Sequence, residues 1–230
     1  MLALASWVVV VSEEDRRRVE RLGLARRKVV LIPHGVDTEN YRGGDRVAMR
    51  RRLGVAPDEL FIVYHGVLHY PPNLEAVRVI IYELLPRLRS LGVGVKVLLI
   101  GVSPPPEADM TPEVIVTGAI EHLPPYLMAA DVGVVPLTAG GGTRLKVLEY
   151  MAAGLPVVST TLGVEGYPFA ADGELIIADD WDTFAARLAE LASDAGRRDR
   201  IGRHNRKLAE RYDWLRIAER YERLYYELLG

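Results

Sequence analysis

Short apolar runs alternate with longer amphipathic segments along most of the chain. The runs are rich in β-branched residues and lack polar alternation, and they lie at 7–11, 29–32, 60–65, 95–100, 114–117, 132–136, 157–159 and 174–177. Runs of this kind are typical of parallel strands that are buried on both faces of a sheet. We therefore predict a parallel sheet, and we interpret the apolar stretch 2–11, which contains the first run, as a buried strand.

Helices are predicted between and after these strands, at 13–22, 73–88, 126–130, 143–153, 182–191, 197–212 and 214–229. Ser12 is a favourable N-cap for the first of them, and Pro86 inside the second is expected to kink or end it. Strands separated by helices predict a doubly wound, Rossmann-like α/β fold. Ligands bind such folds at the carboxyl ends of the strands. We therefore expect the binding site in the loops that follow Gly66, Gly101, Gly118 and Pro136.

Length and composition narrow the class of protein. The 230 residues fit one large α/β domain, or one domain with attached helices. A formal net charge of −2 argues against nucleic acid as a partner, because phosphate backbones need a basic surface. The absence of cysteine excludes disulfides and thiol nucleophiles, and it fits the cytoplasmic location that we expect. The apolar segment 2–11 is too short to span a bilayer and lacks the features of a signal peptide.

A glycine loop at 139–142 is the strongest local signal for chemistry. It follows a predicted strand and opens a predicted helix, so that backbone amides and the helix N-terminus can approach an anion closely. The loop is neither a Walker A motif nor a complete dinucleotide fingerprint. It indicates a phosphate site, and the alternative is a flexible surface turn.

Charged side chains follow this loop on the predicted helix. Arg144 and Lys146 lie in its first turn, where positive charge opposes the helix dipole, and a bound diphosphate would explain them. The alternative is that both are solvated surface charges. Glu149 lies three residues after Lys146, so its carboxylate either accepts two ribose hydroxyls or pairs with Lys146 on the surface.

The segment 138–159 resembles the signature of retaining glycosyltransferases with the GT-B architecture, in the group called family 4. Glu149, Gly154, Pro156, Val157 and Val158 match that signature. Further matches precede and follow it in the family's order and extend over nearly the whole chain, at 10–12, 32–37, 118, 126, 129–131, 136 and 160–166. The resemblance implies that the fold is one half of a GT-B architecture, with crossover helices at its C-terminal end.

The resemblance also implies roles for individual residues. Glu149 takes the ribose, and the diphosphate is received by Gly141, Gly142 and Thr143. Ala119 and Ile120 lie along the nucleobase, and Arg144 and Lys146 supply catalytic charge stabilisation. Neither a metal nor a cofactor is expected, because helix amides and basic side chains carry the charge of the leaving group and the donor is itself the nucleotide-diphospho-sugar.

Several positions depart from the family's pattern. Gly141 stands where the family has a glutamate that touches the donor sugar, and Val67 and Pro72 stand where it often has Arg and Lys. We expect Arg144 and Lys146 to replace these phosphate ligands. Three other polar side chains are secondary candidates with structural roles favoured over functional ones, namely His34, His69 and Asn73.

The resemblance implies an N-terminal, acceptor-binding domain that this chain does not contain. Residues 1–12 resemble the end of that domain, 13–212 are assigned to the donor-binding domain, and 213–230 form a helix expected to pack towards the missing half. Any peripheral membrane association is expected only through that half. An apolar stripe along the last helix (Trp214, Ala218, Tyr221, Tyr225 and Leu228) is expected to be partly exposed.

The function predicted from the sequence is retaining, metal-independent sugar transfer from a nucleotide-diphospho-sugar, by a domain that is inactive alone. Two alternatives remain open at this level. One is a non-catalytic nucleotide-sugar-binding or regulatory module of the same fold, and the other is a nucleotide-sugar epimerase. The base, the sugar and the acceptor are not specified by the sequence.

Overall fold

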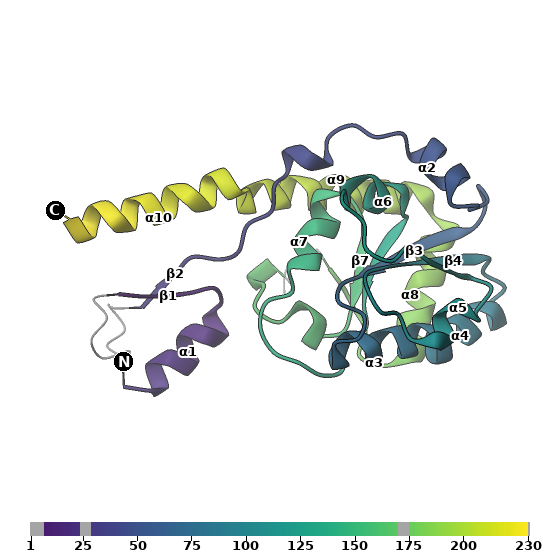
Figure 1. Ribbon diagram of the computed structural model, residues 1–230, viewed down its shortest axis with the longest axis horizontal. Coiled ribbons are helices and arrows are strands. Elements are labelled where there is room, and N and C mark those ends of the chain that lie inside the picture. Colours follow the sequence, from purple (N-terminus) through teal and green to yellow (C-terminus); the bar gives the residue numbers. More distant parts are fainter. Residues whose placement is uncertain (1–6, 24–28, 170–174, 230) are drawn as a thin grey trace.

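The computed structural model describes residues 7–23, 29–169 and 175–229, and Figure 1 shows a larger and a smaller part. Among the described residues the larger part contains a sheet of six strands and the smaller part a sheet of two. All six strands of the larger sheet are parallel, in the order β5-β4-β3-β6-β7-β8. They are β3 (Leu60–His65), β4 (Val95–Ile100), β5 (Val114–Val116), β6 (Val132–Val135), β7 (Val157–Ser159) and β8 (Ile176–Ile177). This order and the flanking helices confirm the predicted Rossmann-like fold. The predicted start of the last strand, Glu174, lies outside the described residues.

Helices cover both faces of this sheet (Figure 1). One face carries α3 (Pro71–Val79), the π-helical turn η4 (Ile80–Leu84), α4 (Leu85–Ser90) and α8 (Trp181–Ser193). The other carries α6 (Pro124–Ala129), α7 (Leu145–Ala152) and α9 (Ala195–Ala209). Because both faces are covered, the central strands are mostly apolar and buried, as in Phe61 to Tyr64 of β3.

The direction of the chain across the sheet reverses between β3 and β6. β3, β4 and β5 run outward to one edge, and β6, β7 and β8 run outward to the other. The loops that follow β3 and β6 therefore diverge to opposite faces and leave a crevice between them, which is where ligands bind in such sheets.

The segment around Pro86 differs from the prediction. The helix does not end at this proline but continues to Ser90, and a π-helical turn (Ile80–Leu84) comes directly before Leu85 and Pro86. A wider turn at this point accommodates the missing amide hydrogen and the bulk of the proline ring. The helix also begins earlier than predicted, at Pro71.

Four short elements were not predicted from the sequence, namely η3 (Glu39–Tyr41), α2 (Arg46–Arg52), α5 (Pro106–Asp109) and η5 (Leu162–Val164). Asp131 holds α2 against the larger sheet. Its buried carboxylate accepts a hydrogen bond from Arg50 Nη1 at 2.9 Å and from the backbone amide of Phe61 at 2.8 Å. Arg46 and Arg198 approach the same carboxylate, so three guanidinium groups satisfy one buried charge.

The smaller part consists of β1 (Val8–Val10), α1 (Glu13–Arg21) and β2 (Val29–Leu31). The two strands pair in parallel with each other and belong to a separate sheet. Ser12 caps α1 as predicted, accepting a hydrogen bond from the Asp15 amide at 3.1 Å. The buried strand predicted at 2–11 is shorter and less buried than expected, and residues 2–6 of it lie outside the described residues. The strand spans Val8–Val10, where Val10 is buried, Val8 is half-buried and Val9 is 36% exposed, because the described part of this sheet has two strands. Helix α1 packs against these two strands, and Arg18 of α1 also lies 3.4 Å from Glu165 of the larger part. The predicted domain boundary between residues 12 and 13 stays a prediction.

Helix α10 (Trp214–Leu229) follows η7 (Glu210–Tyr212), extends beyond the larger part and runs along the small sheet (Figure 1). Its inner face buries Ile217 and Leu224 against Ile32. The predicted apolar stripe lies mostly on the other face, where Trp214 and Tyr225 are exposed. This confirms the expectation that part of the stripe is exposed.

Candidate functional site

A pocket of about 330 Å³ lies at the crevice between β3 and β6. One wall is formed by the end of β3 and the start of α3, with His65, Gly66 and Asn73. The other wall is formed by the glycine loop after β6 and by the first turns of α7. The loops that the sequence singled out after Gly66 and Pro136 therefore meet in one site.

The glycine loop adopts backbone conformations that side chains disfavour. Gly140 and Gly142 have φ values of 100° and 87°, in the left-handed region. A Cβ atom at Gly140 would lie 3.2 Å from the Cγ atom of Pro72 on the opposite wall, so the absence of a side chain also keeps the pocket open.

The start of α7 corrects the prediction that the helix begins at Thr143. The helix begins at Leu145, and Arg144 is its N-cap with an extended backbone (φ −90°, ψ 98°). Gly142 has a left-handed backbone and Arg144 an extended one, and neither conformation is that of an α-helix. The helix therefore cannot begin two residues earlier, at Thr143. Lys146 remains in the first turn, as predicted.

Four of the predicted ligand residues line the pocket around this helix start, namely Gly141, Thr143, Arg144 and Lys146. Gly142 is not among the residues that line this pocket, and its carbonyl accepts a hydrogen bond from the Arg144 guanidinium. Thr143 and Arg144 do line it, and the Thr143 hydroxyl oxygen and the Arg144 Nη2 atom are buried without a hydrogen-bond partner in the described part of the protein.

Lys146 is not a solvated surface charge. Its Nζ atom donates to Asn73 Oδ1 at 3.2 Å and lies 3.9 Å from the centroid of the Tyr64 ring. Burial, together with the neighbouring Arg144, lowers the pKa of Lys146 to about 7, against a smaller opposing effect of Glu149. The contact with Asn73 takes the place of the surface pairing with Glu149 that the spacing alone allowed.

Glu149 faces His65 across the floor of the pocket. Its Oε2 atom lies 3.3 Å from His65 Nε2, which is buried and makes no hydrogen bond. Burial raises the pKa of Glu149, and the charge of Lys146 opposes this shift. Burial, and secondly Lys146, lower the pKa of His65 to about 3, so the imidazole is neutral at physiological pH.

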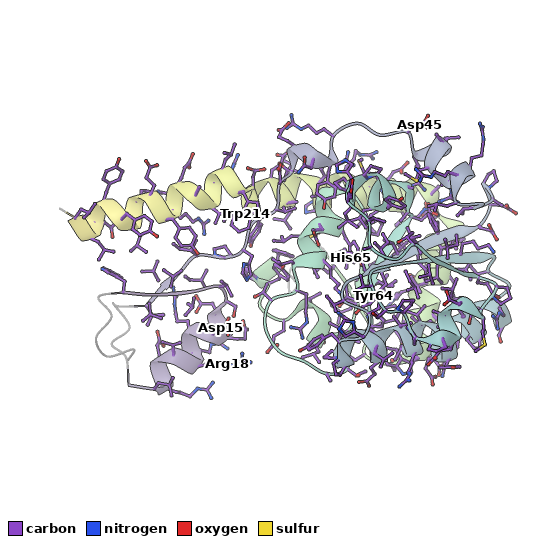
Figure 2. All side chains as sticks on the ribbon, in the orientation of Figure 1. Asp15, Arg18, Asp45, Tyr64, His65 and Trp214 are labelled. Atoms are coloured by element: carbon purple, nitrogen blue, oxygen red, sulfur yellow. The ribbon has the colours of Figure 1, made fainter. Side chains whose placement is uncertain are left out.

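The sequence did not single out Tyr64 or His65, which Figure 2 shows within the larger part. Their position at the carboxyl end of β3, directly before Gly66, was the available signal. Neither belongs to a recognisable motif, and their contacts with Lys146 and Glu149 arise only when α7 packs beside β3.

A second cavity of about 380 Å³ adjoins the first, and Leu145 and Glu149 line both. Its other walls include Tyr41, His122 and Trp214. The cavity is also lined by Glu121, and Ala119 and Ile120 come directly before it in the chain. Ala119 is exposed, whereas Ile120 packs against the core. Their proximity to a nucleobase stays a prediction.

The secondary candidates are placed differently by the structure. Asn73 lines the first pocket, whereas His69 is exposed and His34 is partly buried near the junction of the two parts. Val67 is 48% exposed and Pro72 lines the pocket, so the two positions where the family often has basic residues offer no charge here.

Two features are absent from the residues that the structure describes. No group of three or more His, Cys, Asp or Glu side chains among them is arranged to hold a metal ion. No helix among them is both long and apolar enough to cross a membrane.

The fold and the pocket define a Rossmann-like domain with a glycine-rich loop at the switch point of its sheet. The family model described as glycosyl transferases group 1 matches residues 59–194, more than half of the chain. The chain therefore belongs to the group 1 glycosyl transferases.

Two curated relatives are named D-inositol 3-phosphate glycosyltransferase. The protein of Nocardia farcinica is 28% identical over 232 residues, and the match covers 92% of this chain and 50% of that protein. The protein of Stackebrandtia nassauensis is 33% identical over 211 residues, with 84% of this chain and 47% of that protein covered. The chain thus spans about half the length of the curated relatives it matches.

Two solved structures share the fold. Anabaena Alr3699/HepE in complex with UDP-glucose has a TM-score of 0.77 at 18% identity, over 97% of this chain and 64% of that one. Sucrose-phosphate synthase from Thermosynechococcus elongatus has a TM-score of 0.77 at 24% identity, over 98% of this chain and 59% of that one. These similarities confirm the predicted fold class, one Rossmann-like half of the GT-B type.

Proposed function

We propose that this chain is the donor-binding half of a glycosyltransferase that uses a nucleotide-diphospho-sugar. The observation that carries the proposal is the position of Glu149 on the wall shared by two adjoining cavities. The first cavity offers the glycine loop and Lys146 to a diphosphate, and the second offers Tyr41 and Trp214 to a nucleobase. A carboxylate between them stands where the ribose hydroxyls of a bound nucleotide would lie.

The chemistry proposed for this pocket is stabilisation of the departing nucleoside diphosphate. Negative charge develops on the distal phosphate as the bond to the sugar breaks, and fixed donors aimed at that charge lower the barrier. Lys146, the Thr143 hydroxyl and the amides at the start of α7 are such donors, and the free Nη2 of Arg144 is a fourth. These groups support a reaction without a metal.

The proposal that the sugar is transferred with retention of configuration rests on sequence resemblance. The segment 138–159, which contains Glu149, resembles the signature of retaining glycosyltransferases. The donor class gains support from Alr3699/HepE, whose structure contains UDP-glucose. Gly141 provides no carboxylate for the sugar, so contacts with the sugar are proposed to come from the backbone of the loop. The same glycine would equally suit a module that binds the donor without turnover.

The acceptor is proposed to bind to a further domain of the full-length protein. The curated relatives are about twice as long as their match to this chain. The two-stranded sheet and the exposed face of α10 project beyond the larger part, where such a domain would be placed to cover them (Figure 1). A cytoplasmic location, with any membrane association through that domain, is part of the same proposal.

The direct test is calorimetry of this chain with UDP, GDP, ADP and their sugar conjugates, alongside the Glu149→Ala variant. We expect one base to bind preferentially, and the variant to bind it about 10- to 100-fold more weakly, because two hydrogen bonds to a charged group are lost. Glu210→Ala, which removes an exposed carboxylate on η7, is the matched control and should bind like the wild type.

Two outcomes would count against the proposal. Binding of no nucleotide by the wild-type chain would contradict a donor site in this half. The full-length protein could instead bind a nucleotide tightly and yet transfer no sugar from any donor tested. That result would favour the non-catalytic module.

A further inference from the structure

The side chain of Lys146 is fixed by groups from a different part of the chain. Its ammonium group donates to Asn73 Oδ1 at 3.2 Å and lies over the ring of Tyr64, 3.9 Å from the centroid. Gly66 makes this approach possible, because a Cβ atom there would lie 3.0 Å from Asn73 Nδ2 and 3.4 Å from Lys146 Nζ. A lysine in the first turn of a helix would otherwise extend into solvent, away from the positive end of the dipole.

Asn73 is itself held in one orientation by two further hydrogen bonds. The Tyr64 hydroxyl donates to Asn73 Oδ1 at 2.6 Å, and Asn73 Nδ2 donates to the Val67 carbonyl at 2.9 Å. Tyr64 is fully buried, and burial raises the pKa of its hydroxyl, which therefore remains a donor. The amide oxygen consequently faces Lys146 and the amide nitrogen faces away from it.

We propose that Asn73 and Tyr64 are positioning residues that hold the Lys146 ammonium group towards the distal phosphate of the donor. This role rests on the proposed function, and it explains how the pocket works without basic residues at positions 67 and 72. Lys146 extends from α7 across the pocket to Asn73. It thereby supplies a positive charge on the side of the pocket where Val67 and Pro72 supply none.

Neutral partners suit this task better than a carboxylate would. An amide oxygen and an aromatic ring attract an ammonium group without cancelling its charge, so its attraction for phosphate is preserved. The titratable groups that face Lys146 are Arg144 and Glu149 from its own segment and Tyr64 and His65 from β3. Of these, Arg144 lowers the pKa of Lys146 and Glu149 raises it, while His65 is neutral.

This arrangement links donor binding to protonation. Burial lowers the pKa of Lys146 to about 7, so the amine of the empty site is mostly neutral at pH 8. An entering diphosphate favours the charged form and raises this pKa. Binding at pH 8 should therefore take up close to one proton, and affinity should fall as pH rises above about 7.

The experiment uses the four lysines of the chain, which are Lys28, Lys96, Lys146 and Lys207. Lysine-selective isotope labelling gives one side-chain NMR signal for each, and Lys146→Arg identifies the signal of Lys146. The pH titration of this signal is compared in the wild type, Asn73→Asp and Tyr64→Phe. UDP affinity and proton uptake are measured on the same proteins by calorimetry in two buffers of different ionisation enthalpy.

The expected results separate positioning from folding. Asn73→Asp should raise the pKa of Lys146 yet weaken UDP binding about 10-fold, because the new carboxylate holds the ammonium group and repels phosphate. Tyr64→Phe keeps the ring and should weaken binding about 3- to 10-fold through loss of one hydrogen bond. His69→Ala changes an exposed side chain in the loop between β3 and α3, and this variant should match the wild type in both measurements.

The role is overturned if UDP binds, Glu149→Ala weakens it, and both variants retain the wild-type affinity, proton uptake and Lys146 titration. If the wild-type chain binds no nucleotide, the donor site itself is refuted and this role with it. The second outcome is recognised by the absence of binding, whatever the lysine titration shows.

Discussion

Tyr150 links the packing of α7 to the polar end of β3. Its ring is fully buried, and its hydroxyl accepts a hydrogen bond from the His65 amide at 3.2 Å. Gly133 on β6 lies against the same ring, and a Cβ atom there would be 2.4 Å from Tyr150 Cδ2. The fit of Tyr150 against Gly133 therefore sets the position of the helix that carries Lys146 and Glu149.

Substitution of Gly133 by alanine should disturb this fit. We expect Gly133→Ala to lower the free energy of unfolding by about 1–3 kcal/mol, because overpacking a buried site forces ring and backbone to shift. Urea denaturation measures the change. Gly141→Ala is the matched control, because no atom would lie within 4 Å of its Cβ, and it should change stability by less than about 0.5 kcal/mol. Equal stability of the two variants would contradict the assignment.

At the scale of elements, the central strands could be predicted from the sequence. The runs at 60–65 and 95–100 match β3 and β4 because each is an apolar segment bounded by polar residues or glycine. The start of α7 could not be predicted, because the left-handed Gly142 and extended Arg144 end the loop later than a glycine triplet suggests.

Helix α2 shows a different limit. Its sequence is dominated by arginine, so no apolar periodicity indicates a helix. Two of these arginines bind Asp131, which lies about 80 positions later in the chain. Contacts between residues so far apart in the chain leave no signal in local sequence patterns. For the same reason the sequence did not single out Tyr64 and His65. By contrast, Thr143, Arg144, Lys146 and Glu149 were found because they belong to one continuous segment.

For the whole molecule, the main feature is the apolar outer face of α10. Trp214, Leu215, Tyr225, Tyr226 and Leu229 are exposed on this helix, and they line a groove of about 970 Å³. Apolar surfaces of this kind mark association sites. Under the proposal that a further domain binds the acceptor, that domain covers this face, which is exposed in this chain.

The chain alone should therefore self-associate at micromolar concentration. A Tyr225→Lys and Tyr226→Lys double variant should remain monomeric, because it places two charges in the apolar face. Sedimentation equilibrium distinguishes these states. Tyr82→Lys, at a tyrosine on η4 that is 57% exposed, is the control and should associate like the wild type. A strictly monomeric wild-type chain would show that the face needs no cover.

The assignment of the donor site is best tested by a crystal structure of this chain with the nucleoside diphosphate that binds it most tightly. We expect the distal phosphate within hydrogen-bond distance of Lys146 and the loop amides, the ribose hydroxyls on Glu149 and the base in the adjoining cavity beside Tyr41 and Trp214. A nucleotide bound elsewhere on the chain, with both cavities left open at saturating concentration, would contradict it.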